Sequence, residues 1–119
     1  MRKPTAHIVG DRTVFTWQPE GWPVGVLTGY VNPAGGFVLE HVITFPGAPP
    51  ATLVHMLNAA LEEAWTRGYP YVALHIPAAH PRHAGLTALS AECGFTEYST
   101  SWWVRHKPQE SRSRHAHAG

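Results

Sequence analysis

The chain has 119 residues and a formal net charge of +1 when its nine histidines are neutral. This length suits one domain with a single core, and an apolar content of 44% is ordinary for a globular protein. Near-neutral charge gives no general electrostatic reason to expect nucleic acid or a membrane surface as partner.

The cysteine content and the lack of a long apolar run narrow the class of protein further. Cys93 is the single cysteine, which excludes an internal disulfide and fits a reducing compartment. No apolar run approaches the roughly 20 residues that span a bilayer, and the charged start MRKPTAHIVG is followed by no apolar segment of a signal peptide. The sequence therefore predicts a soluble, cytoplasmic protein.

The N-terminal part of the chain reads as strands. Residues 6–9 and 13–18 are predicted strands around the turn Gly10-Asp11, and residues 24–31 form the next one. The loop NPAGG at residues 32–36 closes a hairpin. These elements predict an antiparallel meander.

The stretch from residue 36 to 67 organises the rest. Residues 37–45 alternate and are nearly all apolar or β-branched, which predicts a strand buried in part on both faces. After the turn PGAPP, an apolar stripe of helical period predicts a helix that ends at Arg67-Gly68. A strand that turns directly into a helix points the free amide groups of the helix start at the end of the sheet, where an anion can bind.

The remaining elements complete a mixed sheet. We expect a strand at residues 71–76, a helix at 83–93 capped by Gly94, and one last strand at 98–105. Residues 1–106 are then one α+β domain, and residues 107–119 (KPQESRSRHAHAG) are predicted to be a disordered tail.

Three segments of this order, LEHVITFPG, LNAALEEAWTRGYPYVALHI and LTALSAECGFTEYSTSWWV, carry a resemblance to a known family. Together with the Gly94-Phe95 pair that ends the second helix, they resemble the GNAT superfamily of N-acetyltransferases over roughly residues 23 to 105. The resemblance implies a mostly antiparallel sheet with a central strand–helix–strand unit and two helices. It also implies acetyl transfer from acetyl-CoA to an amine.

The resemblance places the pyrophosphate of acetyl-CoA on the turn at residues 47–52. The family's glycine-rich pattern is replaced here by Pro49-Pro50, and proline has no N–H to donate. Amide groups at the helix start could still face the anion, although a Pro-Pro turn is also simply a good helix start. The predicted cofactor contacts in this region are Ala48, Ala51, Thr52 and Leu53.

The same resemblance assigns chemistry to the central strand. Glu40 is the predicted base, because a charged side chain in so apolar a strand needs a reason; the alternative is an ion pair with Lys or Arg. Neighbouring residues of a strand point to opposite faces, so only one of Glu40 and His41 is expected to face the cleft. Amide groups near Val42 and Ile43 would hold the thioester carbonyl.

In many family members a tyrosine of the last helix protonates the leaving thiolate. The matching position here is Ser90, which is the predicted acid although a serine hydroxyl is much weaker than a phenol. His83 starts the same helix and, with His80 and Arg82, is a predicted contact for CoA phosphates; the alternative is a solvated polar loop.

Other residues carry weaker signals. Cys93 is expected to pack, and the tail pair His115 and His117 lacks the companions of a metal site, so no metal is predicted. Trp102 and Trp103 should place one indole on each face of the last strand, which, if exposed, would suit a homodimer or another protein partner.

Two functions from different classes remain. One is an acyl-CoA-dependent N-acyltransferase acting on an unidentified amine. The other is a GNAT-like module without catalysis that works through protein–protein contacts, which the Pro-Pro turn and the serine in place of tyrosine favour.

Overall fold

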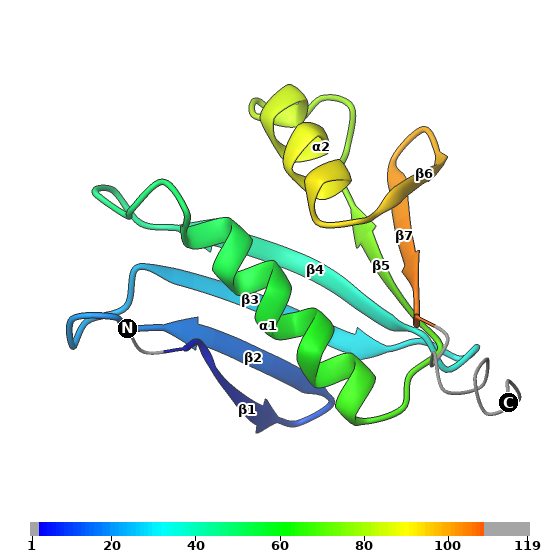
Figure 1. Cartoon of the computed structure of the whole chain (residues 1–119), viewed down its shortest axis with the longest axis horizontal. Coiled ribbons are helices and arrows are strands. Elements are labelled where there is room, and N and C mark those ends of the chain that lie inside the picture. The colour runs from blue at the N-terminus through cyan, green and yellow to red at the C-terminus, as the bar shows by residue number, and fades with distance from the viewer. Residues whose placement is uncertain (1–2, 109–119) are drawn as a thin grey trace, which may run out of the picture.

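A computed structural model describes residues 3–108 (Figure 1). Most of the predicted tail, including His115 and His117, lies outside the described residues. In chain order the elements are β1 (Thr5–Val9), β2 (Arg12–Trp17), β3 (Gly25–Val31), β4 (Phe37–Thr44), α1 (Thr52–Thr66), β5 (Tyr71–His75), α2 (His83–Glu92), β6 (Thr96–Ser99) and β7 (Trp102–His106).

The strands form one seven-stranded sheet in the order β1-β2-β3-β4-β5-β7-β6. Each neighbouring pair is antiparallel except β4 and β5, which are parallel and joined through α1. The prediction of an α+β mixed sheet around a strand–helix–strand unit is therefore confirmed.

The prediction of one final strand at residues 98–105 is wrong. The chain turns at Thr100 and Ser101, so that β6 and β7 form a hairpin. The turn contains no glycine or proline, which is why the sequence did not reveal it; Ser and Thr can also build turns by bonding to nearby backbone. Consequently β7 lies between β5 and β6 and is not the free edge that a dimer through the last strand requires.

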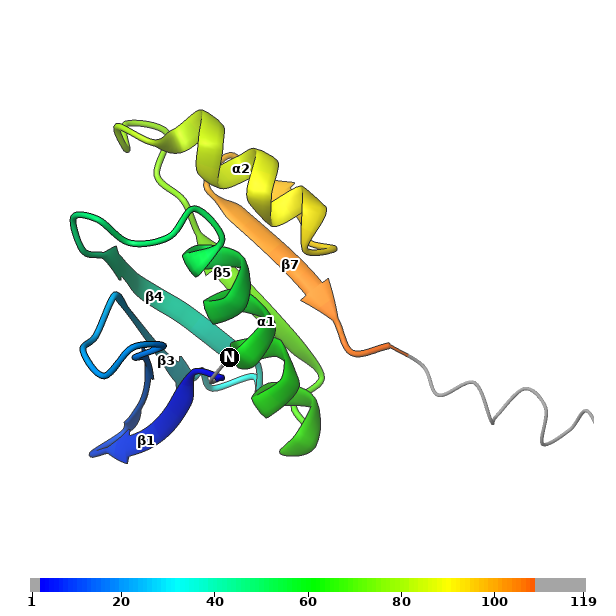
Figure 2. The same cartoon turned by 60° about the vertical axis from the view of Figure 1, so that its left-hand side comes forward.

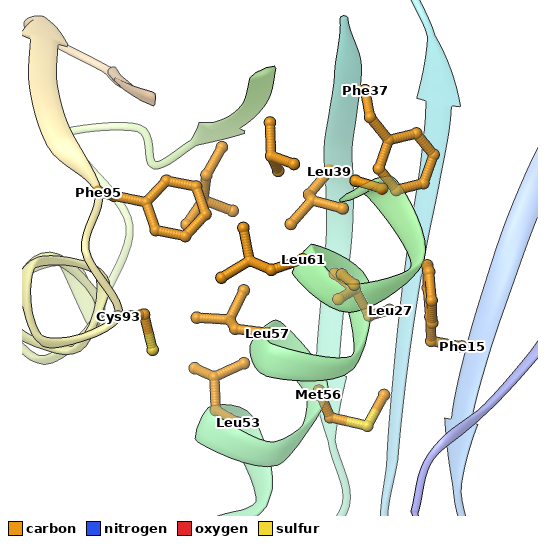
Figure 3. Packing of buried hydrophobic residues seen from close by; sticks show 14 of the residues in the cluster. Phe15, Leu27, Phe37, Leu39, Leu53, Met56, Leu57, Leu61, Cys93 and Phe95 are labelled. Carbon is orange, nitrogen blue, oxygen red and sulfur yellow. The ribbon is translucent and has the colours of Figure 1, made fainter. Parts of the chain in front are cut away.

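Both helices lie on the same face of the sheet (Figure 2). The predicted stripe of α1 is buried, and Leu57 is 1% exposed. Cys93, at the end of α2, and the following Phe95 point toward Leu57 and Leu61 of α1 (Figure 3). The core thus lies between the two helices and the strands beneath them.

The opposite face of the sheet carries no helix within residues 3–108. Strand alternation puts Trp103 against the core and Trp102 on this uncovered face, as predicted. Tyr71 also lies there, close over Gly36: a Cβ on Gly36 would come within 2.1 Å of the Tyr71 ring. Gly36 is therefore needed for Tyr71 to keep its position.

No helix within residues 3–108 combines the length and the apolar character needed to cross a bilayer.

Candidate active site

The parallel pairing of β4 and β5 is short. Only Phe37, Val38 and Leu39 pair with β5, opposite Val72, Ala73 and Leu74. Beyond this point the two strands diverge, as Figure 1 shows. The gap forms a cavity of about 270 Å³, here called the cleft, which is walled by β4, β5 and both helices.

A β-bulge sits on β4 where the cleft opens. In the ladder with β3, Leu39 pairs with Gly29 and His41 with Thr28, so Glu40 is an extra residue. His41 shares the face of Thr28, away from the helices, and Glu40 bonds on that face too. The expectation that Glu40 and His41 point to opposite faces is therefore wrong, because the bulge resets the alternation.

The carboxylate of Glu40 is held by an arginine from two strands away. Arg12 donates through Nε to Glu40 Oε2, and its guanidinium lies 4.5 Å from the centroid of the Tyr30 ring. The hydrogen bond to Glu40 raises the pKa of Arg12, with smaller contributions from the charges of Asp11 and Glu40. Glu40 thus forms the ion pair that was its alternative role, and its role as a base stays a prediction; His41 is exposed.

The start of α1 lies at the end of the cleft, where Leu53 contributes to the wall. The amides of two predicted cofactor contacts are already used, since Ala48 N donates to Phe45 O and Thr52 N to Pro49 O, each at 3.0 Å. The Thr52 hydroxyl also donates to Pro49 O, at 2.7 Å. The amides of Leu53 and the next residue remain available to an anion, because the first helical N–H groups have no partner within a helix.

The start of α2 reaches across toward β4. Arg82 donates through Nη1 to Thr44 Oγ1 at 3.5 Å, so an exposed cation lies between α2 and the end of β4. His80 lines the cleft, whereas His83 is half-buried at the first turn of α2 and is not among the lining residues.

Ser90 lies on the wall of the cleft and is 1% exposed. Its hydroxyl donates to Leu86 O at 2.8 Å within α2, which occupies the only proton it has to give. Its role as acid stays a prediction, and this bond gives it a structural role.

Cys93 is buried beneath α2, and desolvation raises the pKa of its thiol, with a smaller contribution from Glu92. A thiol that holds its proton is a poor nucleophile, which agrees with the expected packing role.

The cleft brings together several of the predicted site residues, namely Glu40, Val42, Ile43, Leu53 and Ser90. Ala48, Ala51, Thr52 and His83 are not among its lining residues. Sequence reasoning missed His75, which ends β5 inside the cleft; a polar residue at the end of an apolar strand was the available signal. Across residues 3–108 no group of three or more His, Cys, Asp or Glu side chains is placed to hold a metal ion.

Solved structures with the same architecture include acetyltransferases. The chain superposes with a TM-score of 0.72 on a protein described as a GNAT-family acetyltransferase from Desulfovibrio desulfuricans, at 10% identity over 81% of this chain and 69% of that one. The ribosomal-protein-S18-alanine N-acetyltransferase of Escherichia coli gives 0.72 at 16% identity over 87% and 74%. A protein proposed to be a streptothricin acetyltransferase from Bacillus anthracis, solved with acetyl coenzyme A, gives 0.72 at 12% identity over 83% and 64%.

These similarities show that the chain has a GNAT-like fold. No family sequence model matches the chain, and no curated protein matches it in sequence. The chain spans between 64% and 74% of the length of the three structures named.

Proposed function

We propose that the protein is an acetyl-CoA-dependent N-acetyltransferase whose acetyl donor binds in the cleft. The observation that carries this is the divergence of β4 and β5 after Leu39 and Leu74, which opens a cleft between strands and leads to the start of a helix. An elongated donor needs such a combination: a slot between strands for its thioester arm and a helix start for its phosphates.

The phosphate end is proposed to lie at α1. Leu53 N and Val54 N supply amide donors at the positive end of the helix dipole. Arg82 supplies a cation from the far side of the cleft, where it already contacts Thr44. Ala48 and Thr52 serve this site through the turn that they brace, because their amides are occupied.

The acyl transfer is proposed to be direct. The amine attacks the thioester carbonyl, the carbon–sulfur bond breaks, and the electron pair leaves on sulfur. Amide groups of β4 near Val42 and Ile43 would stabilise the oxyanion, and Glu40 would take the proton of the amine. A thiol has a pKa of about 8.5, so the thiolate can leave without an acid and Ser90 need not supply a proton.

Calorimetric titration of the purified protein with acetyl-CoA, and separately with CoA, tests the donor site. Micromolar binding is expected. No heat and no thermal shift at millimolar ligand would contradict the proposal.

The alternative is a module without catalysis. It is favoured by the occupied amides of Ala48 and Thr52 and by the committed hydroxyl of Ser90. Failure to bind acetyl-CoA would support this function instead.

A homodimer and a cytoplasmic location stay predictions. With β7 inside the sheet, the free edges among the described strands are β1 and β6. Light scattering at high protein concentration decides between monomer and dimer, and cell fractionation decides the compartment.

A further inference from the structure

The uncovered face of the sheet holds a second cavity, of about 490 Å³, here called the aromatic hollow. Its lining comes mainly from β3, β4, β5, β6 and β7, and its aromatic lining residues include Tyr30, Tyr71, Tyr98 and Trp102. Its volume lies within the range of about 300–1,000 Å³ that is usual for small-molecule sites.

The floor of the hollow lies next to the cleft. Val38 and Ala73, which line it, are ladder partners, and the following pair is the last before β4 and β5 diverge. With a rise of about 3.3 Å per residue, the floor is within roughly 10 Å of the cleft opening.

A pair of tilted rings in contact connects the two cavities. His75 lines the cleft, Trp102 lines the hollow, and their ring centroids are 4.7 Å apart with an interplanar angle of 37°. Glu40 also lies on the uncovered face, since it bonds to Arg12 there. A molecule with its body in the hollow could therefore present a nitrogen beside the proposed base.

The charges of the hollow restrict what it can hold. None of its lining residues is acidic, and the nearby guanidinium of Arg12 already lies over the Tyr30 ring. Polyamines and aminoglycosides carry several cations, and no lining residue offers a carboxylate to pair with the additional ones; aromatic walls can hold a single ammonium group through cation–π contact. Flat apolar rings, in contrast, gain from stacking on aromatic walls.

Tyr71 is fixed in a way that suits such recognition. Asn32 Nδ2 donates to the Tyr71 hydroxyl at 2.9 Å, and the ring packs closely over Gly36. Tyr71 is therefore held in place before any ligand arrives, which lowers the entropic cost of binding.

We propose that the aromatic hollow binds the body of the acceptor and that the acceptor is an arylalkylamine, with an aromatic body and a single amino group on a short alkyl arm. This rests on the proposed acetyl transfer and specifies its second substrate class.

The experiment compares two probe amines, phenethylamine and putrescine, by calorimetry in the presence of CoA. Phenethylamine is expected to bind at least tenfold more tightly. Tyr98→Ala should weaken phenethylamine by about three- to tenfold, the loss of one aromatic contact. Tyr98 is 79% exposed on the edge strand, so its replacement leaves folding intact.

Trp22→Ala is the matched control, since Trp22 is also an exposed aromatic residue, 62% exposed, and is absent from the hollow. It should leave both affinities unchanged. Tyr98→Glu should reduce the preference for phenethylamine over putrescine, because it places a carboxylate at the rim.

The outcomes separate this inference from the proposed function. If acetyl-CoA binds but phenethylamine binds no better than putrescine, or if Tyr98→Ala changes nothing, the acceptor assignment is overturned while acetyl transfer stands. If phenethylamine binds through Tyr98 but acetyl-CoA does not bind, the hollow is not an acceptor site.

Discussion

The two halves of β4 differ sharply although they belong to one strand. Phe37, Val38 and Leu39 are between 0% and 4% exposed, whereas Ile43 is 50% exposed. The first half is paired on both sides, by β3 and β5, and the second half is paired with β3 alone. The same apolar sequence therefore builds core where its backbone is paired on both sides and lines the cleft where pairing with β5 stops.

The largest loss of stability is expected in the first half of β4, which is paired on both sides. Leu39→Ala should destabilise the protein by about 2–5 kcal/mol, because it removes a completely buried side chain and leaves a cavity. Urea unfolding measures the change. Ile43→Ala, in the second half of β4, is the control and should lower the free energy of unfolding by less than about 1 kcal/mol. Equal losses at the two sites would contradict the difference between the two halves.

In the second half of β4, which is paired with β3 alone, a substitution should affect the proposed acetyl transfer more than stability. Glu40→Gln is expected to lower kcat/KM for acetyl transfer by about 10²–10⁴, since an amide cannot accept the proton of the amine. The urea midpoint reports any loss of stability from the changed contact with Arg12. If the turnover of Glu40→Gln is unaltered across pH, Glu40 is not the base.

A smaller effect, on acetyl-CoA affinity, is expected in the turn after β4, just before the start of α1. Ala51→Glu adds a negative charge that the helix dipole tolerates but that repels a phosphate, so acetyl-CoA affinity should fall about three- to tenfold. Ala51→Gln, of the same shape, should bind almost normally. Calorimetry at low and high salt distinguishes the two, because the difference should shrink as salt screens the charge.

The smallest effect concerns the core beneath α2. Burial raises the pKa of Cys93, so the folded state holds the proton more strongly than the unfolded chain does. That contribution is fully present below the unfolded pKa of about 8.5 and is lost as pH rises above it. The urea midpoint should therefore fall between pH 8 and 10 by more in the parent protein than in Cys93→Ala; parallel curves would contradict this.

Local sequence determined most of the fold. The alternation of β4, the helical stripe containing Leu57 and the glycine after Arg67 each act over a few residues, so the strand–helix–strand unit could be predicted. The β6–β7 turn at Thr100 and Ser101 escaped because polar residues without glycine or proline are compatible with either a strand or a turn.

What the sequence could not determine depends on partners far apart in the chain. The bulge at Glu40 depends on register against β3, and its ion pair joins residues 28 positions apart. The ring contact between His75 and Trp102 similarly needs β5 and β7 side by side. Residue types and local periods thus predicted most of the elements and the candidate base, Glu40. Sheet register decided that Glu40 and His41 lie on the same face of the sheet and which cavities lie next to Glu40.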